Sequence, residues 1–231
     1  MSLPGAAHER ACEAILFDLD GTLIDSGGLY ERHWRAWAMA RGIDPGMVVA
    51  LHFGRPAAET IRLVTPELDA VAEAARYNAE LARDPDSSGV SVLEGAPGLL
   101  ESLPAHRWAI VTSAPRVMVE RWLRHLHLPF PGVLVTVDDV ARGKPAPDPY
   151  LRAAELLGRR PERCLAIEDA PAGIMSARAA GAAVLAVAST HQPSDLAEAD
   201  VVVAALSDIR VASTDHGLVV WWREREPGAR T

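Results

Sequence analysis

Short apolar runs rich in β-branched residues recur along the chain, and this repetition restricts the folds that the sequence can adopt. The runs lie at residues 14–18, 108–112, 133–137, 164–169, 183–188 and 200–206. Between the later runs, apolar residues recur at helical spacing in the segments 118–126, 149–158 and 171–182. Strands that alternate with helices build βαβ units, in which helices cover both faces of a parallel sheet. We therefore expect an α/β fold with a Rossmann-like parallel sheet.

The segment between the first two runs breaks this alternation. Its helical periodicity falls in three stretches, at 29–42, 56–64 and 67–82. Turn-forming residues mark its two ends, Gly-Gly at 27–28 and EGAPG at 94–98. We expect residues 27–94 to form a small, all-helical cap domain inserted into an α/β core domain made of residues 10–26 and 95–223. Such an insertion is either a mobile lid or a static subdomain, and its flexible ends favour the lid.

The two ends of the sequence carry simpler signals. Asp215-His216-Gly217 is a turn signal between two apolar runs, which predicts a β-hairpin. Residues 1–9 and the residues from about 224 onward have no periodic pattern, so we expect loose tails there.

The net charge and the lengths of the apolar runs restrict the binding partners and the cellular location that we expect. The formal net charge is −8, so we expect no nucleic-acid-binding surface. No apolar run reaches the ~18 residues of a membrane span. The opening residues, MSLPGAAHERACE, lack the apolar core of a secretion signal. We expect a cytoplasmic protein that does not associate with membranes.

Polar residues follow four of the expected strands at or near their carboxyl ends. They are Asp18 and Asp20 after the first, Thr112 after the second, Lys144 in the loop after the third, and Glu168 and Asp169 at the fourth. The carboxyl ends of parallel strands meet at one edge of a sheet, where ligands bind. We therefore expect these residues to form one site.

Two carboxylates directly after a buried strand repel each other unless a cation lies nearby. Asp18, Asp20 and Asp169 offer the hard oxygen ligands that suit Mg²⁺, which binds few carboxylates and keeps several waters. Lys144 is the only lysine among 23 basic residues and adds a second positive charge. Together the two cations can attract a phosphoryl group to a protein whose net charge is negative.

The loops around these residues support the same interpretation. Gly21 permits a sharp turn that exposes backbone N–H groups. Thr112 and Ser113 precede Pro115, which predicts a helix whose N-terminus could face an anion. Asp148, before a proline, is expected to cap the next helix.

The motifs DLDGT at 18–22, Thr-Ser at 112–113, GKP at 143–145 and ED at 168–169 resemble, in this order, those of the haloacid dehalogenase (HAD) superfamily. The resemblance covers about residues 14–205, and the helical insertion matches members with a helical cap between the first and second motifs. The stretches HRWAIVTSAPR, GKPAPDPYL and AIEDAPAGIMSARAAGA are similar to the sugar- and polyol-phosphate phosphatases, including 2-deoxyglucose-6-phosphatases and glycerol-3-phosphatases.

This resemblance implies a Mg²⁺-dependent phosphatase that hydrolyses a small sugar or polyol phosphate monoester through an aspartyl-phosphate. Asp18 would be the nucleophile, and Asp20 would protonate the leaving group and then activate water. Thr112 would bind a phosphoryl oxygen, and Lys144 would neutralise charge. Mg²⁺ would be held by Asp18, the backbone carbonyl of Asp20, and Asp169.

The same resemblance implies supporting roles for further residues. Glu168 would support the metal site without binding the metal directly. The residues expected to contact substrate are Gly21, Thr22, Ser113 and Arg55. Arg55 lies in a Gly-Arg-Pro turn of the helical segment, and it could instead pair with Glu59 one helical turn later.

Two other activities are open to a chain with these motifs. A sugar phosphomutase of the β-phosphoglucomutase type places a His where this chain has Tyr30, and it uses a cap Lys that this chain lacks. A receiver-like module that stores a phosphate on Asp would be about half as long and would give Asp20 no role. A phosphatase that is monomeric and acts on a small phosphorylated metabolite is therefore the favoured prediction.

Overall fold

The computed structural model describes residues 8–52 and 56–223. The chain divides into two compact units, and Ser26–Val90 form the smaller one. Residues 91–94, expected in the helical insertion, belong to the larger unit. The reason is a short antiparallel pairing between β3 (Ile24–Asp25) and β4 (Ser91–Val92), which ties both connecting segments to that unit.

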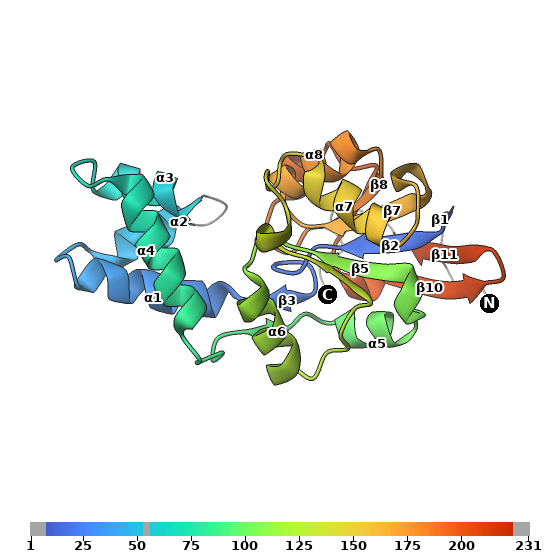
Figure 1. The fold of residues 1–231 in the computed structure, drawn as a ribbon, viewed down its shortest axis with the longest axis horizontal. Helices are drawn as coiled ribbons and strands as arrows, with labels where there is room; N and C mark the ends of the chain where they lie inside the picture. Colours follow the sequence, from blue (N-terminus) through green and yellow to red (C-terminus); the bar gives the residue numbers. More distant parts are fainter. Residues whose placement is uncertain (1–7, 53–55, 224–231) are drawn as a thin grey trace. The chain divides into compact units, whose positions relative to one another are not determined.

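Six parallel strands form the main sheet of the larger unit, in the order β6-β5-β2-β7-β8-β9 (Figure 1). Their bounds are Ala14–Phe17 for β2, Trp108–Val111 for β5, Val133–Val135 for β6, Cys164–Glu168 for β7, Ala183–Val187 for β8 and Val201–Val203 for β9. Each strand lies within one of the apolar runs, so the expected α/β fold is confirmed. Because later strands are added on both sides of β2, its carboxyl end is the switch point of the sheet, where α/β proteins bind ligands.

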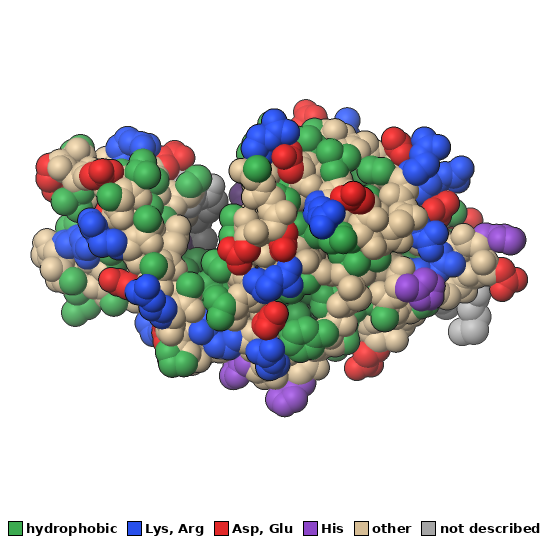
Figure 2. Space-filling model, in the orientation of Figure 1, with side chains coloured by type: hydrophobic (Ala, Val, Ile, Leu, Met, Phe, Trp, Pro, Cys, Tyr) green, Lys and Arg blue, Asp and Glu red, His purple; other side chains and the backbone are tan. Residues whose placement is uncertain are grey.

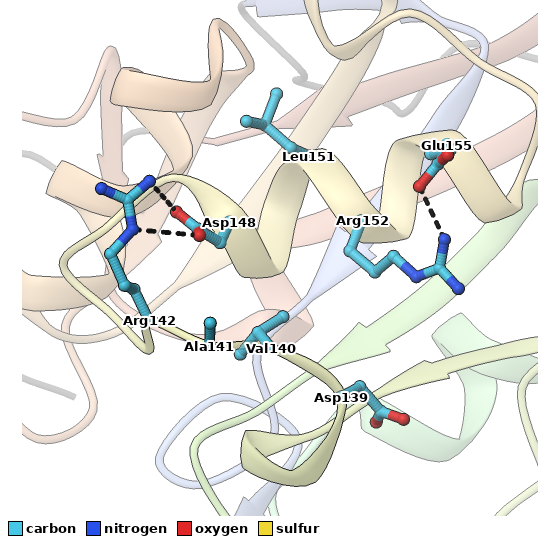
Figure 3. Close-up of a pocket in the computed structure, with 8 residues that line it drawn as sticks. All are labelled: Asp139, Val140, Ala141, Arg142, Asp148, Leu151, Arg152 and Glu155. Carbon is cyan, nitrogen blue, oxygen red and sulfur yellow. Dashed lines mark hydrogen bonds and ion pairs between the residues drawn. The ribbon is translucent and has the colours of Figure 1, made fainter.

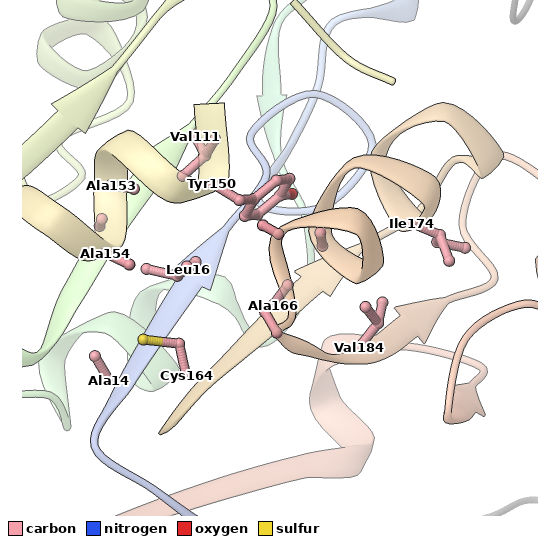
Figure 4. Packing of buried hydrophobic residues seen from close by; sticks show 14 of the residues in the cluster. Ala14, Leu16, Val111, Tyr150, Ala153, Ala154, Cys164, Ala166, Ile174 and Val184 are labelled. Atoms are coloured by element: carbon pink, nitrogen blue, oxygen red, sulfur yellow. The ribbon is translucent and has the colours of Figure 1, made fainter. Parts of the chain in front are cut away.

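Helices cover both faces of this sheet. They are α5 (Ala96–Glu101), α6 (Arg116–His125), α7 (Asp148–Leu156) and α8 (Pro171–Ala180). Figure 1 shows α7 and α8 on one face and α5 and α6 on the other. Leu16 of β2 packs in a buried cluster with Tyr150 of α7 and Ile174 of α8 (Figure 4). Neighbouring strand residues point to opposite faces, so Ile15 and Phe17 are buried on the side of α5 and α6.

A second, antiparallel sheet contains β1 (His8–Cys12), β11 (Gly217–Trp222) and β10 (Ile209–Thr214). The expected hairpin is confirmed as β10 and β11. The expectation of a loose tail was wrong for residues 8 and 9, because β1 pairs with β11 and His8 lies opposite Trp222. Such pairing depends on residues more than 200 positions away, so local periodicity does not reveal it. The expected tail from about residue 224 lies outside the described residues.

The smaller unit is helical, with α1 (Gly27–Met39), α2 (Pro45–His52), α3 (Ala57–Val64) and α4 (Ala70–Arg83). Helix α2 was not expected, because its residues are apolar on nearly all sides and show no helical period. Trp34 of α1 stacks on Tyr77 of α4 with ring centroids 4.1 Å apart.

None of the helices within residues 8–52 and 56–223 combines the length and apolar composition needed to cross a bilayer.

Acidic and basic side chains are interspersed over the face drawn in Figure 2. Ion pairs in which the arginine is exposed join near neighbours in the sequence, among them Arg124–Glu120 at 3.0 Å, Arg152–Glu155 at 2.7 Å and Arg142–Asp148 at 2.9 Å. Exposed pairs of this kind contribute at most about 1 kcal/mol each. Burial of the apolar cores therefore stabilises the fold far more than these pairs do.

One carboxylate lies inside the helical unit. Glu73 is 3% exposed, and Trp37 Nε1 donates to its Oε1 at 2.9 Å. Arg76 Nε donates to Oε2 at 2.9 Å, and Arg41 also pairs with this carboxylate. Burial alone would raise the pKa of Glu73, but the bonds from Arg76 and Trp37 and the charges of Arg41 and Arg76 outweigh it and lower the pKa.

This lowered pKa predicts how the stability of the helical unit depends on pH. The stabilisation from the Glu73 contacts should be fully present above the unfolded-state pKa of ~4.3 and should be lost as pH falls through the folded-state value. We expect Glu73→Gln to lower stability at pH 7 by about 1–3 kcal/mol and to flatten the loss of stability below about pH 5. Thermal unfolding followed by tryptophan fluorescence at several pH values measures both effects. Glu80→Gln, at an exposed position of α4, is the matched control, and equal pH curves for both variants would contradict the assignment.

Candidate active site

Strand pairing continues one residue beyond β2 and β5, and this places Asp18 and Thr112 at the carboxyl edge of the main sheet. The N–H of Asp18 donates to the carbonyl of Ile167 at 2.9 Å, which keeps Asp18 beside the end of β7. The N–H of Thr112 likewise donates to the carbonyl of Val135 at 2.9 Å. The backbone of the sheet therefore fixes the starting points of two of the loops that carry the site.

Lys144 joins three of these strand ends. Its Nζ donates to Asp18 Oδ1 at 2.6 Å, to Glu168 Oε1 at 2.6 Å and to the carbonyl oxygen of Val111 at 3.0 Å. The side chain is 7% exposed. An ammonium has three protons, and three acceptors surround this one. This geometry explains why the residue is a lysine and not an arginine, because a planar guanidinium does not direct three donors from one atom.

Glu168 is enclosed by hydrogen-bond donors. Its Oε1 accepts from Lys144 and from the Tyr150 hydroxyl, the latter at 2.6 Å. Its Oε2 accepts from the backbone N–H groups of Asp169 at 3.1 Å and Ala170 at 3.4 Å. Four donors match the acceptor capacity of a carboxylate. Glu168 therefore holds Lys144 in place and has little capacity left for a metal ion.

Space for the Glu168 carboxylate depends on Gly173 in the first turn of α8. A Cβ at this position would lie 1.8 Å from Glu168 Oε1, far inside van der Waals contact. The missing side chain lets the carboxylate lie against the helix, close to the positive end of its dipole.

Asp18 and Asp169 provide the oxygen atoms that a cation could bind. Asp18 Oδ2 is buried and has no hydrogen-bond partner among the described residues, whereas buried carboxylate oxygens are normally satisfied. Ligand atoms of Asp18, Glu168 and Asp169 lie within 4.8 Å of one another. Hard oxygen donors around one unsatisfied carboxylate oxygen suit Mg²⁺. The site therefore fits this ion, with Asp18 and Asp169 as the carboxylates that remain available.

The pKa values reflect the crowding of charge. Burial, with help from Glu168 and Asp169, raises the pKa of Asp18 well above its usual range, against the opposing effect of Lys144. Burial and the charge of Glu168 raise the pKa of Asp169 to about 7. Burial alone would lower the pKa of Lys144, but Asp18 and Glu168 raise it above its usual value. One ammonium thus faces three buried carboxylates, and a further cation would favour their ionised forms.

The loop after Asp18 contains the other residues of the first motif. Asp20 is half-buried, and the N–H of Gly21 donates to the carbonyl of Ile24 at 2.7 Å, which closes the turn. Thr22, expected to contact substrate, is fully buried, and its hydroxyl donates to Asp169 Oδ1 at 3.4 Å. Its side chain therefore supports the Asp169 carboxylate and does not face solvent.

The loop after β5 differs from expectation in one respect. Thr112 is 3% exposed, its hydroxyl accepts from the N–H of Ala114 at 3.1 Å, and Ser113 is exposed. Helix α6 begins at Arg116, whose N–H donates to Asp138 Oδ2 at 2.9 Å. The expectation that this helix N-terminus could receive an anion was wrong for its first N–H group, because an acidic side chain from the loop after β6 caps it.

Arg55 lies outside the described residues, so substrate contact and pairing with Glu59 both stay predictions. Sequence analysis did not identify Tyr150, Ser189 and Thr190, although all three side chains contact the site. Ser189 and Thr190 follow β8 at the same sheet edge. The expectation that polar residues after the strands form the site covered four strands, and extending it to β8 identifies both residues.

A separate hollow of about 520 Å³ lies along the outer surface of α7 (Figure 3). Its lining residues are Asp139, Val140, Ala141, Arg142, Asp148, Leu151, Arg152 and Glu155. Asp148 was expected to be an N-cap, but α7 begins at Asp148 itself, and its side chain binds Arg142 through two hydrogen bonds of 3.1 and 2.9 Å. This hollow contains none of the expected catalytic residues.

Comparisons with known proteins agree with this geometry. The family model for haloacid dehalogenase-like hydrolases matches residues 12–181. Hexitol phosphatase A of Escherichia coli strain K12 is 40% identical over 214 residues, covering 90% of this chain and 98% of that protein. The 2-deoxyglucose-6-phosphate phosphatase 1 of Saccharomyces cerevisiae is 31% identical over 239 residues, covering 92% and 96%. A HAD hydrolase structure from Entamoeba histolytica gives a TM-score of 0.70 at 26% identity, covering 86% of this chain and 95% of that one. The expected family is confirmed, and the chain belongs to the haloacid dehalogenase-like hydrolases.

Proposed function

We propose that this chain is a Mg²⁺-dependent phosphatase that hydrolyses a small sugar or polyol phosphate monoester through an aspartyl-phosphate. The observation that carries the proposal is the environment of Asp18. One carboxylate oxygen is bound to Lys144, and the other is buried with no hydrogen-bond partner within residues 8–52 and 56–223. A carboxylate held in this way is fixed in orientation and poorly solvated, and both properties favour attack on an electrophile.

The reaction has two steps. An oxygen of Asp18 forms a bond to phosphorus while the ester P–O bond breaks, and Asp20 gives a proton to the leaving alkoxide. Water then loses a proton to Asp20 and attacks the same phosphorus, which restores the Asp18 carboxylate and releases inorganic phosphate. Asp20 lies two residues after the nucleophile in the same loop, so one carboxyl serves as acid and then as base.

Positive charge and hydrogen bonds stabilise the transferring group. Lys144 neutralises charge on Asp18 and on the phosphoryl oxygens nearby, and the Thr112 hydroxyl, which accepts from Ala114, keeps its proton for a phosphoryl oxygen. Asp18, Asp169 and the Asp20 carbonyl would hold Mg²⁺, which supplies charge neutralisation when bound. Gly21 and Ser113 provide further polar contacts at the same sheet edge, while Thr22 acts by supporting Asp169.

The substrate class rests on the relatives. One is a hexitol phosphatase and another a 2-deoxyglucose-6-phosphate phosphatase, and they match this chain over most of their own lengths. We assign the helical unit, Ser26–Val90, the role of a cap that covers a small ester and excludes water during transfer. Arg55 would contact the ester from this cap. The partner is a small phosphorylated metabolite, and a monomer suffices because one chain carries the whole residue set.

Replacing the nucleophile tests the mechanism. We expect wild-type protein to release phosphate from a hexitol phosphate and from 2-deoxyglucose-6-phosphate in Mg²⁺ and to lose this activity in EDTA. Asp18→Asn keeps the shape but removes the nucleophilic carboxylate, so kcat should fall at least about 1,000-fold. The measurement is phosphate release across a panel that also contains glycerol-3-phosphate, phosphoglycolate and a nucleotide.

The control for this experiment is Asp215→Asn, in the exposed turn of the hairpin. It removes one carboxylate far along the chain from the site and should leave kcat unchanged. Phosphate release that persists in Asp18→Asn would exclude the aspartyl-phosphate route, and release that persists in EDTA would exclude the metal.

Gly173 provides a test of the support around Lys144. Gly173→Ala forces the Glu168 carboxylate out of its place, so we expect kcat to fall at least about 10-fold and stability to fall by about 1–3 kcal/mol. Gly98→Ala, also in a helix, meets nothing within 4 Å and should raise stability by about 0.5–1 kcal/mol without changing kcat. Steady-state kinetics and thermal unfolding of both variants make the comparison, and a wild-type kcat in Gly173→Ala would show that Glu168 can move freely.

A further inference from the structure

The loop after β8 contacts both acidic loops of the candidate site. The Ser189 hydroxyl donates to the carbonyl of Gly21, and the Thr190 hydroxyl donates to Asp169 Oδ2. Both residues are exposed, whereas Asp169, whose carboxylate Thr190 helps to hold, is 4% exposed. This loop therefore links the turn after Asp18 to the carboxylate of Asp169, which directly follows the neighbouring strand β7.

The direction of the Thr190 hydrogen bond follows from counting protons. An ionised carboxylate only accepts, so the single hydroxyl proton of Thr190 is donated to Asp169. Thr190 Oγ1 also lies 2.8 Å from His191 Nδ1. With its proton on Nδ1, His191 donates to this oxygen, and the hydroxyl proton stays directed at Asp169.

The methyl group of Thr190 has a separate contact. A Cβ built on Gly21 would lie 2.8 Å from Thr190 Cγ2 and 2.2 Å from Asp169 Oδ2. The glycine, the threonine methyl and the carboxylate oxygen therefore share one small space. Of the ordinary residues, threonine alone supplies both this methyl group and the hydroxyl.

The opposite oxygen of Asp169 is held from another side. Thr22, fully buried, donates to Oδ1 at 3.4 Å. Two hydroxyl groups thus fix the carboxylate orientation and use about half of its acceptor capacity, which leaves electron pairs for a metal ion.

We infer that Thr190 is a positioning residue that orients Asp169 to bind Mg²⁺, which makes the loop after β8 part of the metal site. This inference rests on the proposed function, in which Asp169 is a metal ligand. Hydrogen bonds to metal-binding carboxylates reduce the reorganisation that binding requires, and their loss commonly weakens affinity by about 10–100-fold.

Two near-isosteric variants separate the hydroxyl from the methyl group. Thr190→Val keeps the methyl and removes the donor, and Thr190→Ser keeps the donor and removes the methyl. In calorimetric titrations with Mg²⁺ and no substrate, we expect Thr190→Val to raise Kd about 10-fold and Thr190→Ser to stay within about 2-fold of wild type. At saturating Mg²⁺, kcat of Thr190→Val should recover, because the nucleophile and Lys144 are untouched.

Thr214→Val, at an exposed position at the end of β10, is the matched control and should bind Mg²⁺ like wild type. If the valine variant does not fold, Thr190→Ala is compared with Thr190→Ser, because both lack the methyl group and only serine keeps the donor. Wild-type affinity in Thr190→Val, or equal weakening in the valine and serine variants, would overturn the role of the hydroxyl while leaving the phosphatase proposal intact. No Mg²⁺ binding by wild type would overturn the metal part of the proposed function and this inference with it.

Discussion

The three hydrogen bonds of the Lys144 ammonium hold the active-site edge of this protein together. They join the end of β2, the end of β5 and the end of β7 through Asp18, the Val111 carbonyl and Glu168. An unpaired ammonium or carboxylate at this depth would be strongly unfavourable, because neither is hydrated. Each partner therefore stabilises the charged form of the other. Separating the loops would leave a buried charged group without its partner, so the three hydrogen bonds keep the loops together.

The parts of the fold and site that local patterns determine could be predicted from the sequence. The parallel strands were recognisable because burial on both faces demands a continuous apolar run. Because ligands bind at the carboxyl ends of parallel strands, the sequence alone predicts that Asp18, Thr112, Lys144 and Asp169 lie in one region. That prediction needed the topology but no detail of side-chain packing.

Features that depend on distant contacts were not predictable in this way. Strand β1 exists because a hairpin formed by the last described residues pairs with it. The side chain of Thr22 turns inward because Asp169 offers an acceptor there, and Asp138 caps α6 because a different loop brings it close. Thr190 was overlooked because an exposed Ser-Thr pair after a strand looks like an ordinary loop when its contacts are unknown.

The pairing of β3 with β4 affects how a chain with this fold can evolve. Asp25 lies opposite Ser91, so the two points where the helical segment leaves and rejoins the larger unit are as close as the two arms of a hairpin. A tight turn could replace the whole helical segment and leave both strands paired. The insertion is therefore an exchangeable module, and helical segments of other lengths and specificities can be accommodated at this position without rebuilding the sheet that carries the chemistry.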